Sequence, residues 1–314
     1  MLIVVIVLTV GACFFAAEMF FSVAVDRNSI INRIIGRGHT ETVVSLQEQN
    51  GSDGTKKGKS WFEKTAEDVY ITSDDGLKLH GYLAENEKSG GKYVIVFHGY
   101  TSEGSHMKKY VKRFYDLGYG VLALDARAHG ASEGDICGMG WLERKDALRW
   151  IDMLIQKNAD CKIVLFGVSM GGATVMMTAG EEELPSQVVA GIEDCGYTSV
   201  WDEFGYRLKK MFRLPSFPIL NLASLITKWR GGYDFKEASA IEQVKKCRIP
   251  MLFIHGEKDK FVPFSMLDKL YNAAECDKRK LIIPGAGHTK SASTDPDTYW
   301  GTVEEFLGGY LPKK

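Results

Sequence analysis

One serine lies in a glycine-containing turn between a strand-like run and a helix-like run, and this feature constrains the fold most. Residues 162–166 (Lys-Ile-Val-Leu-Phe) form the continuous apolar run that a buried parallel strand needs. Residues 173–177 continue as an apolar helix start. Between them, Gly-Val-Ser-Met-Gly-Gly at 167–172 matches the G-x-S-x-G turn, which exposes a serine hydroxyl at the edge of a sheet. The same letters can arise by chance, so the strand and helix around them are what favour a nucleophilic role for Ser169.

The bulk composition is that of an ordinary globular protein. With 314 residues, 45% hydrophobic and 25% charged, the chain has room for one large domain plus an accessory segment. A net charge of −1, with both signs mixed along the chain, predicts no nucleic-acid partner. The six cysteines have no C-x-x-C spacing, so we expect free thiols and neither a zinc site nor a disulfide framework. They are Cys13, Cys137, Cys161, Cys195, Cys247 and Cys276.

The N-terminal stretch predicts a transmembrane anchor at residues 1–25. Within residues 2–25 the clearly polar members are Thr9, Glu18 and Ser22, and about 20 apolar residues suffice to cross a bilayer. A cleaved signal peptide has a basic start and an apolar core of roughly 7–15 residues. Here no Lys or Arg precedes a longer run, and the same absence argues against lipoprotein processing at Cys13.

Glu18 and the flanking charges bear on how this anchor sits in the cell membrane. Glu18 can reach the interface, be protonated or pair with a partner helix, and the sequence leaves these options open. Arg27, Arg33 and Arg37 follow the span, so the positive-inside rule places the C-terminal domain in the cytoplasm. Unpaired cysteines agree with that reducing compartment.

The remaining chain divides into a connecting segment and an α/β domain. Residues 26–60 form a juxtamembrane segment, with an interfacial helix expected in 30–49 and a flexible linker in 50–60. From residue 61 to 314, helical patterns separate short apolar runs, which predicts a mostly parallel, doubly wound sheet covered on both faces. The expected strands are a hairpin (69–72 with 78–83) followed by 93–97, 121–124, 163–166, 188–192, 251–254 and 281–283.

A long connection at about 197–246 separates two of these strands. Apolar residues recur in it at helical spacing, for example Trp201, Phe204 and Leu208, and again from Ile219 to Trp229. A long connection with its own structure is usually functional, so we expect a small helical lid. The alternative is a helical insertion that only packs on the sheet.

Two later loops supply partners for the serine. A nucleophilic serine needs a general base and an orienting acid, which follow the G-x-S-x-G turn in the order acid, then histidine. Asp259 follows the strand at 251–254, and His288 follows the strand at 281–283. We therefore predict Ser169, Asp259 and His288 as the catalytic residues. The backbone N–H groups of Met170 and Tyr100 are the expected donors to an oxyanion.

Other acidic and histidine residues compete for these roles. Glu257 is the alternative acid, but it lies nearer the strand end than Asp259 does. Asp194 can either support the site or be a buried, hydrogen-bonded carboxylate. The other histidines are expected to be packed, solvated or loop-supporting rather than basic catalysts: His39, His80, His129 and His255.

Taken together, these motifs resemble the α/β-hydrolase superfamily over residues 61–314. The matching segments are His98-Gly99, the loop from Asp125 to Gly134, the Ser169 turn, the stretch from Gly256 to Pro263, and Gly287-His288. The pattern is most similar to the serine aminopeptidase (S33) and lysophospholipase-like branch, and within it to membrane-anchored bacterial hydrolases. One departure is Ala128, where many relatives carry glycine, which affects loop geometry rather than the triad.

The resemblance implies hydrolysis of an ester, thioester or amide through an acyl-serine, without a metal or organic cofactor. We expect a serine hydrolase acting on carboxylic esters, with a small-molecule or lipid acyl substrate. The alternatives are a peptidase or amidase, although no residue visibly binds a substrate amino group, and a non-catalytic membrane-tethered binding protein. A metal hydrolase lacks support because the chain has no H-E-x-x-H or comparable ligand spacing.

Overall fold

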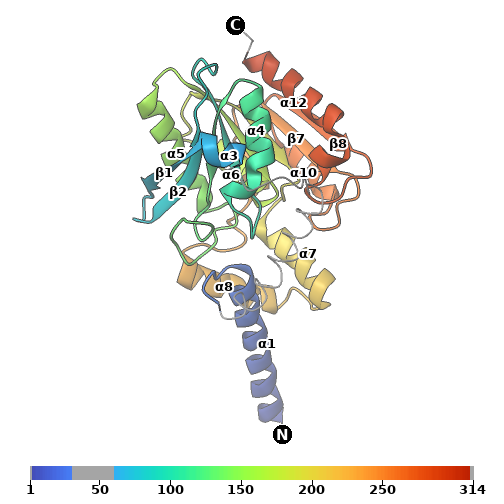
Figure 1. Cartoon of the computed structure of the whole chain (residues 1–314). Coiled ribbons are helices and arrows are strands. Elements are labelled where there is room, and N and C mark those ends of the chain that lie inside the picture. The colour runs from blue at the N-terminus through green and yellow to red at the C-terminus, as the bar shows by residue number, and fades with distance from the viewer. Residues whose placement is uncertain (1, 30–59, 312–314) are drawn as a thin grey trace.

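The fold was obtained as a computed structural model, which describes residues 2–29 and 60–311 (Figure 1). The interfacial helix expected in 30–49, His39 and all but the last residue of the expected linker lie outside the described residues. The described part holds an eight-stranded sheet with helices on both of its faces.

The sheet has the order β1-β2-β4-β3-β5-β6-β7-β8. The first two strands pair antiparallel, β2 pairs antiparallel with β4, and all remaining neighbours are parallel. The strands are β1 (Ala66–Thr72), β2 (Lys78–Ala84), β3 (Lys92–Phe97), β4 (Gly120–Leu124), β5 (Lys162–Val168), β6 (Val188–Asp194), β7 (Met251–Gly256) and β8 (Lys278–Ile283).

The predicted α/β class and each predicted strand are confirmed. Strands β4 and β7 are buried along their whole length, which is why their sequences read as continuous apolar runs. By contrast, β1 is an edge strand whose residues are half-buried or exposed, so it carries polar residues. In the hairpin turn between β1 and β2, Gly76 has φ +87°, a conformation that favours glycine.

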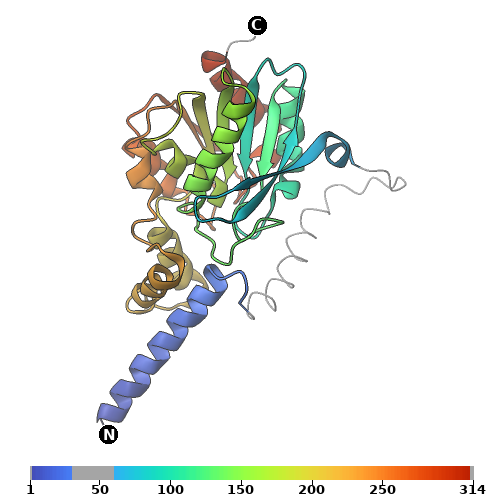
Figure 2. The same ribbon diagram turned by 90° about the vertical axis from the view of Figure 1, so that its left-hand side faces the viewer.

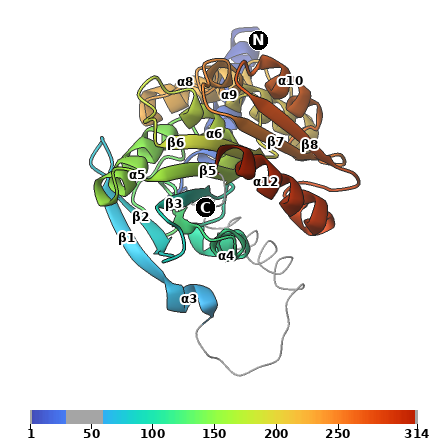
Figure 3. The same ribbon diagram turned by 90° about the horizontal axis from the view of Figure 1, so that it is seen from above.

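Helices cover the two faces of the sheet as separate layers (Figure 3). On one face, apolar residues of α4 and α12 pack on the strands; on the other, those of α5, α6, α9 and α10 do so. Their bounds are α4 (Lys108–Asp116), α5 (Glu143–Lys157), α6 (Met170–Ala179), α9 (Ala240–Val244), α10 (Ser265–Ala273) and α12 (Pro296–Tyr310). Short helices α3 (Trp61–Thr65), η1 (Gly104–Met107) and α11 (Ser291–Thr294) complete the domain.

Three helices lie together at the end of the molecule away from the C-terminus (Figures 1 and 2). Helices α7 (Val200–Phe212) and α8 (Ile219–Gly231) come from the long connection between β6 and β7. Helix α1 (Leu2–Ala24) projects from this end, and its C-terminal half packs against α8, with Ala17 and Phe21 buried. By length and composition, α1 is the one helix of the described chain able to cross a membrane.

Candidate active site

Ser169 stands on a sharp turn between β5 and α6. Its φ and ψ are 59° and −116°, a strained backbone that directs the side chain out of the strand-to-helix junction. A Cβ on Gly171 would lie 2.1 Å from the carbonyl oxygen of Phe97, so only glycine fits beside the end of β3. The backbone N–H of Ser169 donates to the carbonyl oxygen of Asp194 at 2.8 Å, which ties the turn to β6.

Three side chains from different loops form a continuous hydrogen-bonded chain. Nδ1 of His288 lies 2.7 Å from Oδ2 of Asp259, and Nε2 of His288 lies 2.9 Å from Oγ of Ser169. Because the Asp259 carboxylate can only accept, Nδ1 carries the proton and Nε2 is left to accept the serine O–H. The structure therefore brings together the three side chains singled out from the sequence, each just beyond a parallel strand.

Asp259 is buried but strongly stabilised as a carboxylate. Its Oδ1 accepts the backbone N–H groups of Phe261 and Val262 at 2.8 and 3.1 Å. Burial raises its pKa, but hydrogen bonds from His255 and His288 outweigh that effect and hold the pKa of Asp259 at about 2. The carboxylate is thus ionised throughout the neutral range and can fix the tautomer of His288.

His255 is a second histidine on the same carboxylate, and this contact was missed from the sequence. His255 is fully buried at the end of β7. Its Nε2 lies 3.3 Å from Oδ2 of Asp259 and 3.2 Å from the carbonyl oxygen of Val262. The expected packed role of His255 therefore includes a direct contact with Asp259. In the sequence, the alternation of side chains along β7 indicates only that His255 points to the opposite face of the sheet from the residues on either side of it. It does not indicate which residue His255 contacts.

The loop after β3 lies directly against the serine. A Cβ on Gly99 would be 3.5 Å from Cβ of Ser169. Tyr100 is the next residue of this loop. His98 shapes the loop: one ring nitrogen lies 2.7 Å from the Gly99 carbonyl oxygen, and the other accepts the N–H of Ala126 at 3.0 Å. Burial lowers the pKa of His98, in keeping with this neutral ring. Met170, the first residue of α6, directs its N–H toward the helix N-terminus.

Helix α7 reaches the site through an aromatic contact. The Phe261 ring stacks on the His288 ring, with centroids 4.7 Å apart and planes at 19°. The Arg207 guanidinium of α7 covers the Phe261 ring at 3.7 Å, and the Tyr206 hydroxyl donates to the Lys260 carbonyl oxygen at 3.1 Å. The predicted lid segment therefore contacts the loop that carries Asp259.

One further group on α7 was not found from the sequence. Glu203 is 3% exposed, and neither carboxylate oxygen has a hydrogen-bond partner among the described residues. Burial raises its pKa to about 8, Arg207 opposes that shift, and the charge of Asp259 adds to it. Nothing in the pattern of α7 distinguishes this carboxylate from a solvated one, because its burial depends on packing between distant segments.

The other candidates have contacts of their own. Glu257 accepts the N–H of Gly285 at 3.1 Å, and Asp194 accepts hydroxyl groups from Tyr299 and Ser291 at 3.0 and 3.2 Å. His129 is buried, and burial lowers its pKa to about 3, so it stays neutral beside the Arg127 carbonyl oxygen. His80 bridges two carboxylates, with Nδ1 2.7 Å from Asp125 and Nε2 3.1 Å from Asp68.

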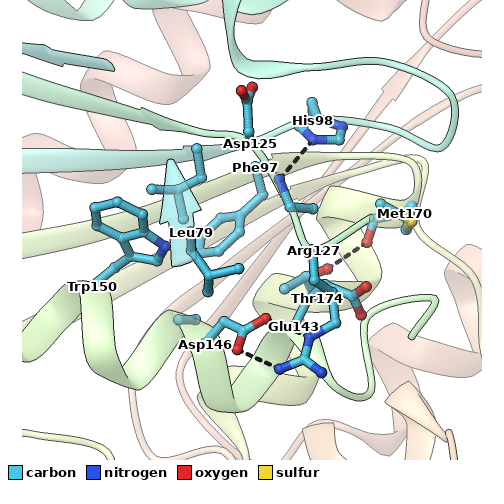
Figure 4. Close-up of a pocket in the computed structure, with 13 residues that line it drawn as sticks. Leu79, Phe97, His98, Asp125, Arg127, Glu143, Asp146, Trp150, Met170 and Thr174 are labelled. Carbon is cyan, nitrogen blue, oxygen red and sulfur yellow. Dashed lines mark hydrogen bonds and ion pairs between the residues drawn. The ribbon is translucent and has the colours of Figure 1, made fainter. Parts of the chain in front are cut away.

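A buried ion pair supports the region behind the turn (Figure 4). The guanidinium of Arg127 makes two hydrogen bonds to Asp146, at 2.6 and 2.7 Å, and a further pair to Asp75 at 2.9 and 3.2 Å. These bonds join the loop after β4 to α5 and to the β1–β2 turn. The adjoining cavity, of about 20 Å³, holds at most a water molecule and is far too small for a substrate.

One group of potential metal ligands occurs among the described residues. Ligand atoms of Cys195, Asp259 and His288 all lie within 4.8 Å of one another. Two of these side chains are committed to the hydrogen-bonded chain with Ser169, and burial raises the pKa of the Cys195 thiol. The arrangement therefore suits proton transfer to and from Ser169 better than metal binding.

Comparisons with known proteins place this geometry in a family. The family model "Serine aminopeptidase, S33" matches residues 90–210. Protein YqkD of Bacillus subtilis is 32% identical over 268 residues, covering 85% of this chain and 86% of the relative. The α/β hydrolase domain-containing protein WAV2 of Arabidopsis thaliana is 28% identical, covering 79% of this chain and 80% of its own.

Solved structures of similar proteins have the same fold as this chain. The Pyrococcus furiosus esterase Pf2001 superposes with a TM-score of 0.64 and 25% identity, over 82% of this chain and 99% of the esterase. Acetyl xylan esterase 1 from Thermoanaerobacterium, at 18% identity and a TM-score of 0.60, shares the fold. On its sheet order, its strand–serine–helix turn and these relationships, the chain belongs to the α/β-hydrolase superfamily, in the serine aminopeptidase (S33) branch.

Proposed function

We propose that this protein is a membrane-anchored serine hydrolase that cleaves carboxylic esters through an acyl-serine intermediate. The observation that supports it most is the hydrogen-bonded chain from Ser169 through His288 to Asp259, with contacts of 2.9 and 2.7 Å. A serine hydroxyl is a weak nucleophile alone, and a neutral, oriented imidazole at this distance is what activates it.

In this proposal, Oγ of Ser169 attacks the substrate carbonyl carbon while Nε2 of His288 takes the hydroxyl proton. The imidazolium that forms is stabilised by the ionised Asp259, and the oxyanion accepts the N–H groups of Met170 and Tyr100. His288 then protonates the leaving alcohol as the carbon–oxygen bond breaks. A water molecule, deprotonated by His288, releases the acid from the acyl-serine and returns Ser169 to its starting state.

One comparison favours an ester as the substrate, and helix α1 favours a location at a membrane. A similar solved structure is that of a protein named an esterase. Helix α1 is apolar and long enough to span a bilayer, and the burial of Ala17, Phe21 and Val25 argues that it is retained rather than cleaved as a signal sequence. We assign residues 61–314 as the catalytic domain, with a lid at about 197–246, and place that domain in the cytoplasm because Arg27, Arg33 and Arg37 follow α1.

The second candidate is hydrolysis of an aminoacyl amide. It is favoured by the S33 aminopeptidase description of the matching family model and by Glu203, a buried carboxyl group without a hydrogen-bond partner among the described residues, which would ionise on pairing with a cationic amine.

A substrate panel separates the two candidates. Purified full-length protein and its Ser169→Ala variant are assayed on p-nitrophenyl esters of increasing acyl length beside aminoacyl p-nitroanilides. Ester turnover that disappears in the variant supports the proposal. Turnover confined to the anilides would replace it with the second candidate, and no Ser169-dependent turnover of either class would favour the non-catalytic binding protein.

A further inference from the structure

The lid helices expose large apolar side chains to solvent. Phe217 is 75% exposed and Trp229 is 80% exposed, and exposed apolar side chains that form a patch mark an interaction site. Leu225 and Trp229 are four residues apart, so they share one face of α8. We call the exposed apolar set of α7, α8 and their connection the lid surface; it comprises Met211, Leu214, Phe217, Leu225 and Trp229.

The lid helices sit beside the point where α1 leaves the domain (Figures 1 and 2). Glu18 of α1 forms an ion pair with Arg230 of α8 at 2.5 Å, which accounts for an acidic residue inside the apolar run. Phe20 of α1 meets Phe204 of α7 edge to face, with centroids 5.2 Å apart. The position of α1 in a membrane therefore fixes the position of the lid helices.

The length of α1 brings the lid helices to the bilayer. The residues of α1 before Ala16 carry most of its exposed surface, and Ala17 is fully buried. At 1.5 Å per residue, this free part measures roughly 20 Å, whereas the hydrocarbon core is about 30 Å thick. About 10 Å of hydrocarbon must then lie alongside the packed half of α1, which is where α8 runs.

The charges of this region suit a lipid headgroup layer. Residues 204–233 contain no Asp or Glu. Lys209, Lys210 and Arg213 form no ion pair with another described residue. Basic residues next to exposed Trp and Leu are typical of segments that lie in a membrane interface and contact anionic lipids. The basic residues of the segment are Arg207, Lys209, Lys210, Arg213, Lys228 and Arg230.

We propose that the lid surface docks into the leaflet that α1 enters, so that the site of Ser169 takes lipid acyl esters directly from the bilayer. This inference rests on the membrane anchoring proposed above and adds the second contact. Helix α7 joins the docked surface to the site, because Arg207 covers Phe261, which stacks on His288. The occupant of the lid surface is the interface of a phospholipid bilayer.

Lipid quenching of tryptophan tests the contact. Full-length protein is reconstituted in vesicles of phosphatidylcholine and phosphatidylglycerol, with or without bromine on the acyl chains. Acyl-chain quenching is expected in the wild type, to be largely lost in Trp229→Phe, and to persist in Trp300→Phe, the matched control in α12 at the opposite end. Equal quenching in the wild type and Trp229→Phe would overturn the proposal.

An activity test uses the pair Phe217→Glu/Leu225→Glu against Ile282→Glu, a control at an exposed position on β8. The double variant is expected to lose about tenfold or more of its turnover of a vesicle-embedded ester, while hydrolysis of a short water-soluble ester is unchanged and reports correct folding. Equal turnover of the embedded ester in all three proteins would contradict docking.

The outcomes distinguish docking from anchoring. Protein that sediments with vesicles but shows no Trp229-dependent quenching would overturn the lid contact alone. Protein that stays in the supernatant would overturn anchoring and docking together. A dimer in detergent micelles, combined with no acyl-chain quenching, would show that a second copy of the chain covers the lid surface instead.

Discussion

Asp259 and His288 are joined by a 2.7 Å hydrogen bond, although Glu257 follows β7 more closely and carries the same functional group. Glu257 does not contact His288 because its carboxylate instead accepts the N–H of Gly285. Asp259 is further held by His255 and by two backbone N–H groups, which explains its low pKa.

Asp259→Asn is therefore expected to reduce kcat/KM by about 10³ to 10⁴, because an amide no longer fixes the His288 tautomer or stabilises the imidazolium. Glu257→Gln, the matched control, is expected to stay within about threefold of the wild type. Steady-state kinetics on a short-chain ester measure both. A Glu257→Gln loss equal to that of Asp259→Asn would contradict the assignment.

The turn around Ser169 depends on a glycine. Gly171→Ala is expected to lower the free energy of unfolding by about 3 kcal/mol or more, because the new Cβ meets the Phe97 carbonyl oxygen at 2.1 Å. Gly308→Ala in α12 meets nothing within 4 Å and is expected to be stabilising by up to about 1 kcal/mol. Thermal unfolding in detergent compares them, and similar Tm values would refute the steric argument.

The buried pair of Arg127 and Asp146 gives a stability test. Arg127→Met is expected to cost about 3 to 5 kcal/mol, because Asp146 is then left as a buried, unpaired charge. Adding Asp146→Leu removes that charge and should recover part of the loss. Arg149→Met, which breaks an exposed pair with Asp74, should leave the free energy of unfolding nearly unchanged, because solvent screens exposed ion pairs. Equal losses for Arg127→Met and Arg149→Met would show that burial does not matter here.

Glu203 predicts a pH dependence of stability. Its folded pKa of about 8 exceeds the ordinary value of 4.5, so the folded state holds a proton that the unfolded state releases. The free energy of unfolding should therefore fall as pH rises from 4.5 to 8. Glu203→Gln lacks this group, so its stability relative to the wild type should rise by about 4 kcal/mol between pH 5 and pH 9, which is about three pH units of titration at 1.36 kcal/mol each. Chemical denaturation at both pH values measures the difference, and parallel pH curves would exclude a protonated Glu203.

Much of the fold was predictable because its signals are local. Apolar runs marked the buried strands, and Ser169, Asp259 and His288 each lie in the turn or loop that follows such a run. The contacts of Glu203, His255 and Arg127 were not predictable, because each depends on which segments far apart in the chain pack together. Likewise, the apolarity of residues 2–25 does not distinguish the half of α1 that packs on α8 from the half that is exposed.

The most direct measurement of the central claim is covalent labelling of the full-length protein by a fluorophosphonate, with the modified peptide identified by mass spectrometry. We predict one labelled residue, Ser169, no labelling of Ser169→Ala, and strongly reduced labelling of His288→Ala. A folded wild-type protein that does not react, or reacts equally after Ser169→Ala, would contradict catalysis by Ser169.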